Sequence, residues 1–149
     1  MKRRDDGYVL IYVLIVVVLL AALAAAAGTV AVRNITAQRA AEARTREKYE
    51  AVGMIERMRT HLDGLTLPIG AADASEEIGS IAREYARSSY PDGALEVGTV
   101  IASGSEYQIP LTATSGEMQI TAELVFSARD GQIVFVRYDA YEVRAMEAV

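Results

Sequence analysis

The fold is decided by residues 8–32, which read YVLIYVLIVVVLLAALAAAAGTVAV. This stretch contains no charged side chain and no proline. As an α-helix rising about 1.5 Å per residue it would reach roughly 37 Å, more than the hydrocarbon core of a bilayer, which is about 30 Å thick. A buried helix of this uniformity would need a large protein around it, and the whole chain has 149 residues. The sequence therefore predicts one membrane-spanning helix.

Two other interpretations of this stretch stay open. A cleaved secretory signal would combine the basic residues at 2–4 with a small-residue cleavage site within residues 24–28. Against it, an acidic pair at 5–6 interrupts the basic region, and the helical pattern continues past Val32. The second alternative is a plain signal anchor that belongs to no particular family.

The charges on either side of the stretch bear on its orientation. The positive-inside rule compares the Lys and Arg residues near the two ends of a span. Three such residues precede the stretch. Five follow it, at Arg33, Arg39, Arg44, Arg46 and Lys48. This count nominally places the C-terminal body on the cytoplasmic side, and we expect the opposite orientation only from the family resemblance given below.

The same five cations could contact DNA or form a solvated helical face. They are interleaved with Glu42, Glu47 and Glu50, which offset much of the local positive charge. The chain carries a formal net charge of -5, and an acidic body is a poor general ligand for nucleic acid. We therefore expect a solvated face or contact with lipid head groups, and no nucleic-acid partner.

Residue types that carry catalysis are scarce. There is no cysteine, which excludes disulfides, thiolate metal sites and thiol nucleophiles. His61 is the only histidine, so a catalytic relay or a multi-histidine metal site has little to start from, and we expect its ring to face solvent. Asp73, Glu76 and Glu77 could be drawn as a calcium cluster, but acids in a first helical turn also complement the helix dipole. We expect no catalytic residue, no cofactor and no metal.

Helical periodicity continues beyond the apolar stretch. Residues 33–65 contain no proline and are rich in good helix formers, with Gly53 as the one weak position. An apolar stripe at spacings of three and four follows the second half: Val52, Ile55, Met58, Leu62 and Leu65. Such a stripe is expected to face another part of the fold.

A second, shorter helix is predicted after a connecting stretch at residues 63–70, which contains two glycines and a proline. Asp73 and Glu76 have the spacing of an N-cap with its capping box. One face of this helix carries Ile78, Ile81, Ala82 and Tyr85. The turn-forming sequence YPDG at 90–93 ends it.

The remaining sequence changes to strand periodicity. Apolar and polar side chains alternate within 106–114 and 117–128, which is typical of antiparallel strands with one covered face. Outer strands are predicted at 95–103 and 132–143. Turns are predicted at 104–105, 115–116 and 130–131, where glycines occur. Strict alternation also predicts Tyr138 and Tyr141 on opposite faces of the last strand, so that at most one of them is in the core.

The predicted fold is therefore α+β. A long N-terminal transmembrane-plus-amphipathic helix packs on a four-stranded antiparallel meander sheet, with one short extra helix. The stripe at Ile55, Met58 and Leu62 is the expected cover for the apolar face of the sheet. Pro110 cannot donate to a ladder, so its strand is expected to be bulged there or to lie on an edge.

Together these features resemble the type IV pilin or pseudopilin family. The residues that carry the resemblance are the charged leader KRRDDG at 2–7, Tyr8 as first mature residue, and the helix predicted over 8–65. The resemblance implies four segments: a leader peptide at 1–7, a transmembrane helix at 8–32, its extracytoplasmic continuation at 33–65, and a domain of short helix plus antiparallel sheet at 66–149.

The resemblance also implies processing and partners. In this family a prepilin peptidase cleaves after the glycine, here Gly7, and methylates the new N-terminus, here Tyr8. The helices then bundle into a filament core, and the sheets form its outside. The implied partners are the membrane, other pilin or pseudopilin subunits, the filament assembly platform and the peptidase. The C-terminal domain would lie outside the cell membrane and, after processing, on a surface filament.

The sequence departs from the family at one important position. Most members carry a glutamate as fifth mature residue, assigned to neutralise the N-terminal ammonium of a neighbouring subunit, and Tyr12 stands there in this chain. The K-type minor pseudopilins, which cap filament tips, resemble this chain in lacking it. The resemblance thus implies a minor structural subunit of a type IV pilus or a related secretion or DNA-uptake filament, with the tip as its expected place. The alternative is a single-pass, membrane-anchored extracytoplasmic binding domain that never polymerises.

Overall fold

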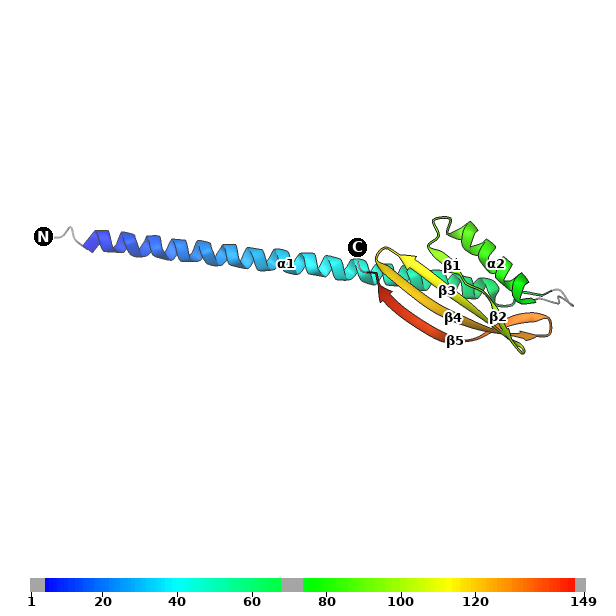
Figure 1. Cartoon of the computed structure of the whole chain (residues 1–149). Helices are drawn as coiled ribbons and strands as arrows, with labels where there is room; N and C mark the ends of the chain where they lie inside the picture. Colours follow the sequence, from blue (N-terminus) through cyan, green and yellow to red (C-terminus); the bar gives the residue numbers. More distant parts are fainter. Residues whose placement is uncertain (1–4, 68–73, 147–149) are drawn as a thin grey trace. The chain divides into compact units, whose positions relative to one another are not determined.

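The computed structural model describes residues 5–67 and 74–146, which contain two helices and five strands (Figure 1). In chain order these are α1 (Asp5–Leu62), α2 (Ala74–Ser89), β1 (Leu95–Val97), β2 (Ile101–Ser103), β3 (Glu106–Ser115), β4 (Met118–Arg129) and β5 (Gln132–Ala145). The chain divides into two compact units, residues 1–42 and 43–149. The predicted α+β class is confirmed.

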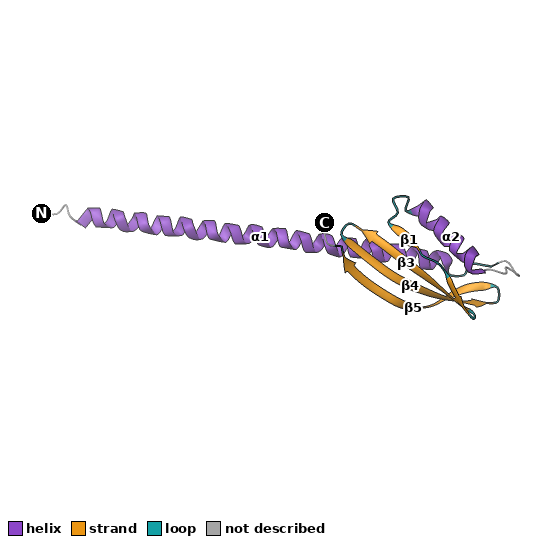
Figure 2. Cartoon of the chain, in the orientation of Figure 1, coloured by secondary structure: helices purple, strands orange, loops and turns teal. Residues whose placement is uncertain are grey.

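The described residues of the first unit are helical throughout (Figure 2). The stretch predicted to span a membrane, 8–32, lies entirely within α1. Its alanines and leucines are strong helix formers, and no proline interrupts them. Gly28 costs about 1 kcal/mol relative to alanine, which is too little to break so long a helix.

The second unit is built around one apolar core. Ile55, Met58 and Leu62 of α1 are almost fully buried, and they belong to the same cluster as the inward-facing residues of the sheet. Val52 and Leu65 are partly buried at its margin. Because residues three and four positions apart share one face of a helix, this row covers the apolar face of the sheet, as predicted.

The second helix adds to the same core. Ile78 and Ala82 of α2 are fully buried there, and Ile81 and Tyr85 are partly buried against it. The face predicted for this helix is therefore confirmed, and α2 ends just before the predicted turn. The predicted N-cap, Asp73, lies outside the described residues.

The sheet is antiparallel, in the order β1-β3-β4-β5, and β2 also pairs with β3. The predicted count of four strands was wrong, because the first predicted strand, 95–103, is divided into β1 and β2. The turns between the later strands lie where they were predicted. Positive φ angles occur there at Gly104, Gly116, Asp130 and Gly131.

Pro110 explains why the first strand is divided. The Gly98 N–H donates a hydrogen bond of 2.8 Å to the Pro110 carbonyl. Since the N–H and C=O of one strand residue point to the same side, the missing N–H of Pro110 is on the side of β1 and β2. Pairing with β3 resumes in β2 with the register shifted by one residue. The irregularity predicted at Pro110 is thus present, but the neighbouring strand is the one interrupted.

Tyr138 and Tyr141 lie on the same face of β5, which corrects the prediction that they face opposite ways. Tyr138 is paired with Leu124 and Tyr141 with Ala122, two fully buried residues of β4. A β-bulge between these pairs adds one residue to β5, so strict alternation fails across it. The two rings meet edge to face with centroids 6.3 Å apart.

Candidate functional site

The apolar segment of α1 is uncovered within the part of the chain that the structure describes. Every side chain from 8 to 32 is exposed, whereas the core helix of a soluble protein is mostly buried. By length and composition the segment is compatible with a single membrane span. Lipid, or other apolar helices within lipid, would supply the cover that the described part of the chain does not.

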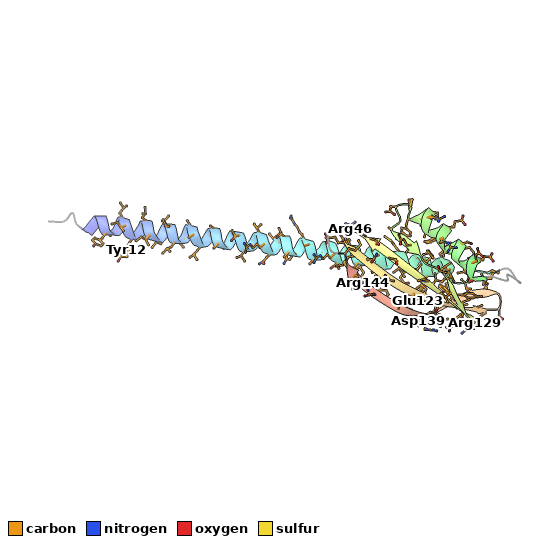
Figure 3. The ribbon with its side chains drawn as sticks, viewed as in Figure 1. Tyr12, Arg46, Glu123, Arg129, Asp139 and Arg144 are labelled. Atoms are coloured by element: carbon orange, nitrogen blue, oxygen red, sulfur yellow. The ribbon has the colours of Figure 1, made fainter. Side chains whose placement is uncertain are left out.

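The residues predicted to act in processing and assembly all lie near the start of α1. Gly7 and Tyr8 fall within the helix, whose first residue is Asp5. Tyr8 and Tyr12 are one helical turn apart and expose 71% and 67% of their surface. Figure 3 shows the Tyr12 side chain projecting from the helix. Both rings are therefore available to lipid or to a neighbouring helix, and their roles in cleavage and assembly stay predictions.

The five cations that follow the apolar segment differ in their surroundings. All five side chains are exposed, in agreement with the predicted solvated face. Arg46 forms an ion pair of 2.9 Å with Glu50, and Arg44 lies 4.0 Å from the Glu117 carboxylate. In the part of the chain that the structure describes, no ion pair involves Arg33, Arg39 or Lys48.

Glu47 and Glu50 attach α1 to the turn between β3 and β4. The Glu47 carboxylate accepts a hydrogen bond from the Glu117 N–H at 3.0 Å, and Glu50 accepts one from the Ser115 hydroxyl at 2.9 Å. Gly116 between them has a φ of 55°, and a Cβ at this position would clash with the Glu47 carboxylate. Glycine therefore suits both the backbone angle and the close approach of the Glu47 carboxylate, which a Cβ would displace.

A second set of polar side chains connects α1 to β5. It consists of Glu56 and Arg59 on the helix and Asp63 directly after its end, at spacings of three and four. The Glu56 carboxylate accepts a hydrogen bond from the Tyr138 hydroxyl and pairs with Arg59 at 2.8 Å. The Arg59 guanidinium lies 5.1 Å from the centre of the Phe135 ring, and Asp63 accepts the Phe135 N–H at 2.9 Å. These contacts fix the helix against the last strand of the sheet.

The hydrogen bond between Glu56 and Tyr138 shifts the pKa of both groups. The pKa of Glu56 is lowered, first by the hydrogen bond from Tyr138 and then by Arg59. Burial raises the pKa of Tyr138, and the bond to Glu56 raises it further. The pair is therefore most favourable with an ionised carboxylate and a neutral phenol, which is its state over the neutral pH range.

Within residues 5–67 and 74–146 no group of three or more His, Cys, Asp or Glu side chains could hold a metal ion. One member of the considered calcium cluster, Asp73, lies outside those residues. His61 is exposed, as predicted, but its ring also stacks on Tyr85 with centroids 4.1 Å apart. This stacking attaches the end of α1 to α2, which indicates a structural role.

Sequence reasoning missed the polar contacts of α1 with the sheet. The sequence pattern predicts Glu47 and Glu50 on a solvated helical face and assigns no role to Glu56. A signal was present in their spacing, because Glu47 and Glu50 are three residues apart and Glu56 lies next to Ile55 of the apolar stripe, which places acids at the border of the buried face. Their partners on β3, β4 and β5 are long-range and could not be assigned from that spacing.

Comparison with known proteins assigns no family to the chain. No family model matches it, and no curated protein does. Among solved structures, a de novo designed β-sheet protein with a cystatin fold matches 52% of this chain and 100% of its own, with 14% sequence identity and a TM-score of 0.39. A likeness of this size carries no argument about function.

Proposed function

We propose that the chain is a minor pilin-like structural subunit of a type IV pilus or a related secretion or DNA-uptake filament. The supporting observation is that the apolar segment of α1, residues 8–32, is not covered by any described residue of the chain. Such a segment can be buried only in lipid or against other apolar helices. The first environment suits a membrane-held precursor with its domain outside the cell, and the second suits a filament core.

The contacts within the second unit support the same proposal. Load on a filament subunit passes between its helix and its domain, so the two must not separate. Here Glu47 and Glu50 accept hydrogen bonds from the turn between β3 and β4, and Glu56 and Asp63 accept hydrogen bonds from β5. Together with the buried stripe they join residues 43–62 of α1 to the sheet along both the turn and the last strand.

A second candidate is a membrane-anchored binding domain that does not polymerise. The observation that favours it is a groove between α2 and β1, which contains arginines without ion pairs within the described residues. The two candidates differ in what meets the apolar segment of α1. A filament subunit places other protein helices against it, whereas a lone anchor places only lipid there.

Cysteine cross-linking tests the proposed function, because the native chain contains no cysteine. Single cysteines would replace Val16, Val17, Val18 and Leu19 in turn, which samples all sides of the helix. We expect disulfide or bis-maleimide cross-links to other pilin-like subunits in sheared surface filaments, strongest on one or two sides. The absence of cross-links from all four variants, with the protein retained in the membrane, would overturn the filament proposal and leave the lone anchor.

Peptide mass analysis of the membrane-extracted chain tests the processing step. The proposal requires a mature N-terminus at Tyr8 that carries one methyl group. A start within residues 24–29 would instead identify a secretory signal. An intact leader that is still attached would identify a plain signal anchor.

A further inference from the structure

A groove between α2 and β1 is not used by the contacts described above. Its volume is about 430 Å³, and Figure 1 shows the helix and the strand that border it side by side. The floor is apolar and is formed by Ala86, Leu95 and Val97. Arg83 and Arg87 line the groove from α2, and Tyr90 lines it from directly after the end of that helix.

One wall of the groove is an open strand edge. Hydrogen bonds to β3 flank β1 at both ends, from the Thr114 N–H to the Ala94 carbonyl at 2.7 Å and from the Gly98 N–H to Pro110. Because the direction of main-chain bonding alternates along a strand, the N–H and C=O groups of Leu95 and Val97 point away from β3. None of these four groups has a hydrogen-bond partner within residues 5–67 and 74–146.

The opposite wall carries two cations without counterions. Arg83 and Arg87 are one turn apart on α2, and neither forms an ion pair with any described residue. Arg83 is partly buried, and its guanidinium nitrogens lie 3.4 Å from where a Cβ of Gly79 would lie. Glu96 in the groove lining, and Glu84, which lines a separate hollow on α2 with the same two arginines, are exposed, and neither is paired with these arginines. Two unpaired arginines beside an open edge are conspicuous in a chain of net charge -5.

We propose that this groove binds an extended, acidic peptide segment of a partner protein. The segment adds as a strand to the free edge of β1, and its carboxylates pair with Arg83 and Arg87. Strand addition supplies the missing partners of Leu95 and Val97, while the arginines select for acidic side chains. The inference does not depend on whether the chain polymerises.

A second copy of this chain fits the groove less well than a separate partner does. The other open edge of the sheet belongs to β5, whose acidic residues include Asp139 and Glu142. Asp139 is paired with Arg137 at 2.9 Å and Glu142 with Arg144 at 2.8 Å. These carboxylates already have cations of their own, so charge complementarity favours a segment from a different protein.

Fluorescence anisotropy with the full chain in lipid nanodiscs tests this inference. The probe is a labelled mixture of eight-residue peptides with glutamate at alternate positions and Val, Ile or Thr at the others. The matched probe carries glutamine in place of each glutamate. We expect the acidic probe to bind at least about tenfold more tightly, which corresponds to about 1.4 kcal/mol. Hydrogen exchange at the Leu95 and Val97 amides should slow when the acidic probe is bound.

Two variants separate the two parts of the groove. Arg83→Gln/Arg87→Gln should weaken binding of the acidic probe about tenfold or more. Its control is Arg57→Gln/Arg129→Gln, which makes the same change in net charge at two exposed arginines outside the groove. Arg129 lies at the end of β4 (Figure 3). The control variant should bind the acidic probe as tightly as the native chain does. Val97→Pro removes an N–H that points into the groove without removing a bond to β3, and should also weaken binding.

Three results would overturn the inference. In the first, the acidic and glutamine probes bind with equal affinity, whether weak or strong. In the second, the Arg83→Gln/Arg87→Gln variant binds the acidic probe as tightly as the native chain does. Protection of the Leu95 and Val97 amides that rises with protein concentration, without any peptide, would show that a second copy occupies the edge. Circular dichroism of each variant establishes that a loss of binding is not a loss of folding.

Discussion

The Tyr138 hydroxyl of β5 donates a hydrogen bond to the Glu56 carboxylate of α1, although the two residues are 82 positions apart in the sequence. The same carboxylate forms an ion pair with Arg59, one turn further along the helix. A charged group therefore lies at the border between the helix and the last strand. Its protonation is expected to change how firmly they are joined.

Glu56→Gln should lower the free energy of unfolding by about 1 kcal/mol at neutral pH. The glutamine amide can still accept the phenolic proton, so the variant removes the charge and leaves the geometry. The estimate is modest because the Glu56 side chain is 44% exposed, which lets solvent screen the charge. Urea unfolding of the full chain in detergent micelles, followed by tyrosine circular dichroism, measures the difference.

The difference between native chain and Glu56→Gln should depend on pH in a defined direction. The pKa of Glu56 is lower in the folded chain than the unperturbed value of about 4.3, so the ionised form is stabilised by folding. That contribution is fully present above the unfolded pKa and is lost as the pH falls through the folded pKa. The two stability curves should therefore converge below about pH 4. Curves that stay parallel through this range would show that the charge contributes nothing.

Gly116→Ala should destabilise the second unit more than Gly104→Ala does. Both glycines have positive φ, 55° and 63°, so both substitutions introduce a similar backbone strain. A Cβ at Gly104 meets nothing within 4 Å, whereas one at Gly116 displaces the Glu47 carboxylate from the Glu117 N–H. We expect an extra loss of about 1 to 2 kcal/mol at Gly116 in urea unfolding. Equal losses for the two variants would show that the contact of α1 with this turn is not stabilising.

Met58→Asp should unfold the second unit, because it places an unpaired carboxylate at a fully buried position under the sheet. The expected loss is about 3 to 5 kcal/mol, comparable to the whole stability of a small domain. Met58→Leu is the matched control and should cost less than about 1.5 kcal/mol, since volume and polarity are nearly kept. If thermal melts of the two variants coincide, the stripe on α1 does not form the core.

The parts of this fold that could be predicted from sequence are those set by short-range patterns. The stripe at Ile55, Met58 and Leu62 recurs with the helical period, and the glycine-containing turns require positive φ that few other residues adopt. Both signals lie within a few neighbouring residues. They predicted the helices and three long strands with boundaries close to those observed.

The parts that could not be predicted depend on residues distant in sequence. Pro110 interrupts β1 and β2 only because they pair with β3 on the side where its N–H is missing. Tyr138 and Tyr141 share a face because a bulge lies between them, and a bulge leaves no mark in an alternating pattern. The open groove beside Arg83 likewise follows from the packing of α2 on β1 and not from any motif in the helix.

Tyr12 is the residue on which the proposed place in a filament depends. Its ring is 67% exposed in the chain alone, on the uncovered apolar segment of α1. If the N-terminal ammonium of Tyr8 is buried among apolar helices, a neighbouring carboxylate must offset its charge, or the burial costs several kcal/mol. Tyrosine has no carboxylate, so Tyr12 cannot take that role. A chain with Tyr12 therefore has no anion to offer a subunit above it.

The missing carboxylate at position 12 predicts that this chain is present in few copies, at the filament tip, where no subunit lies above it. In sheared filaments, quantitative mass spectrometry should find this chain far below the major subunit, and its deletion should reduce filament number more than filament length. Tyr12→Glu should raise its share along the shaft, whereas Tyr12→Phe, which keeps the ring and adds no charge, should not. Stoichiometric incorporation of the native chain along the shaft would contradict this prediction. The N-terminal ammonium of each neighbouring subunit would then be buried without a carboxylate from this chain, and charge pairing at position 12 would not decide where the chain lies in the filament.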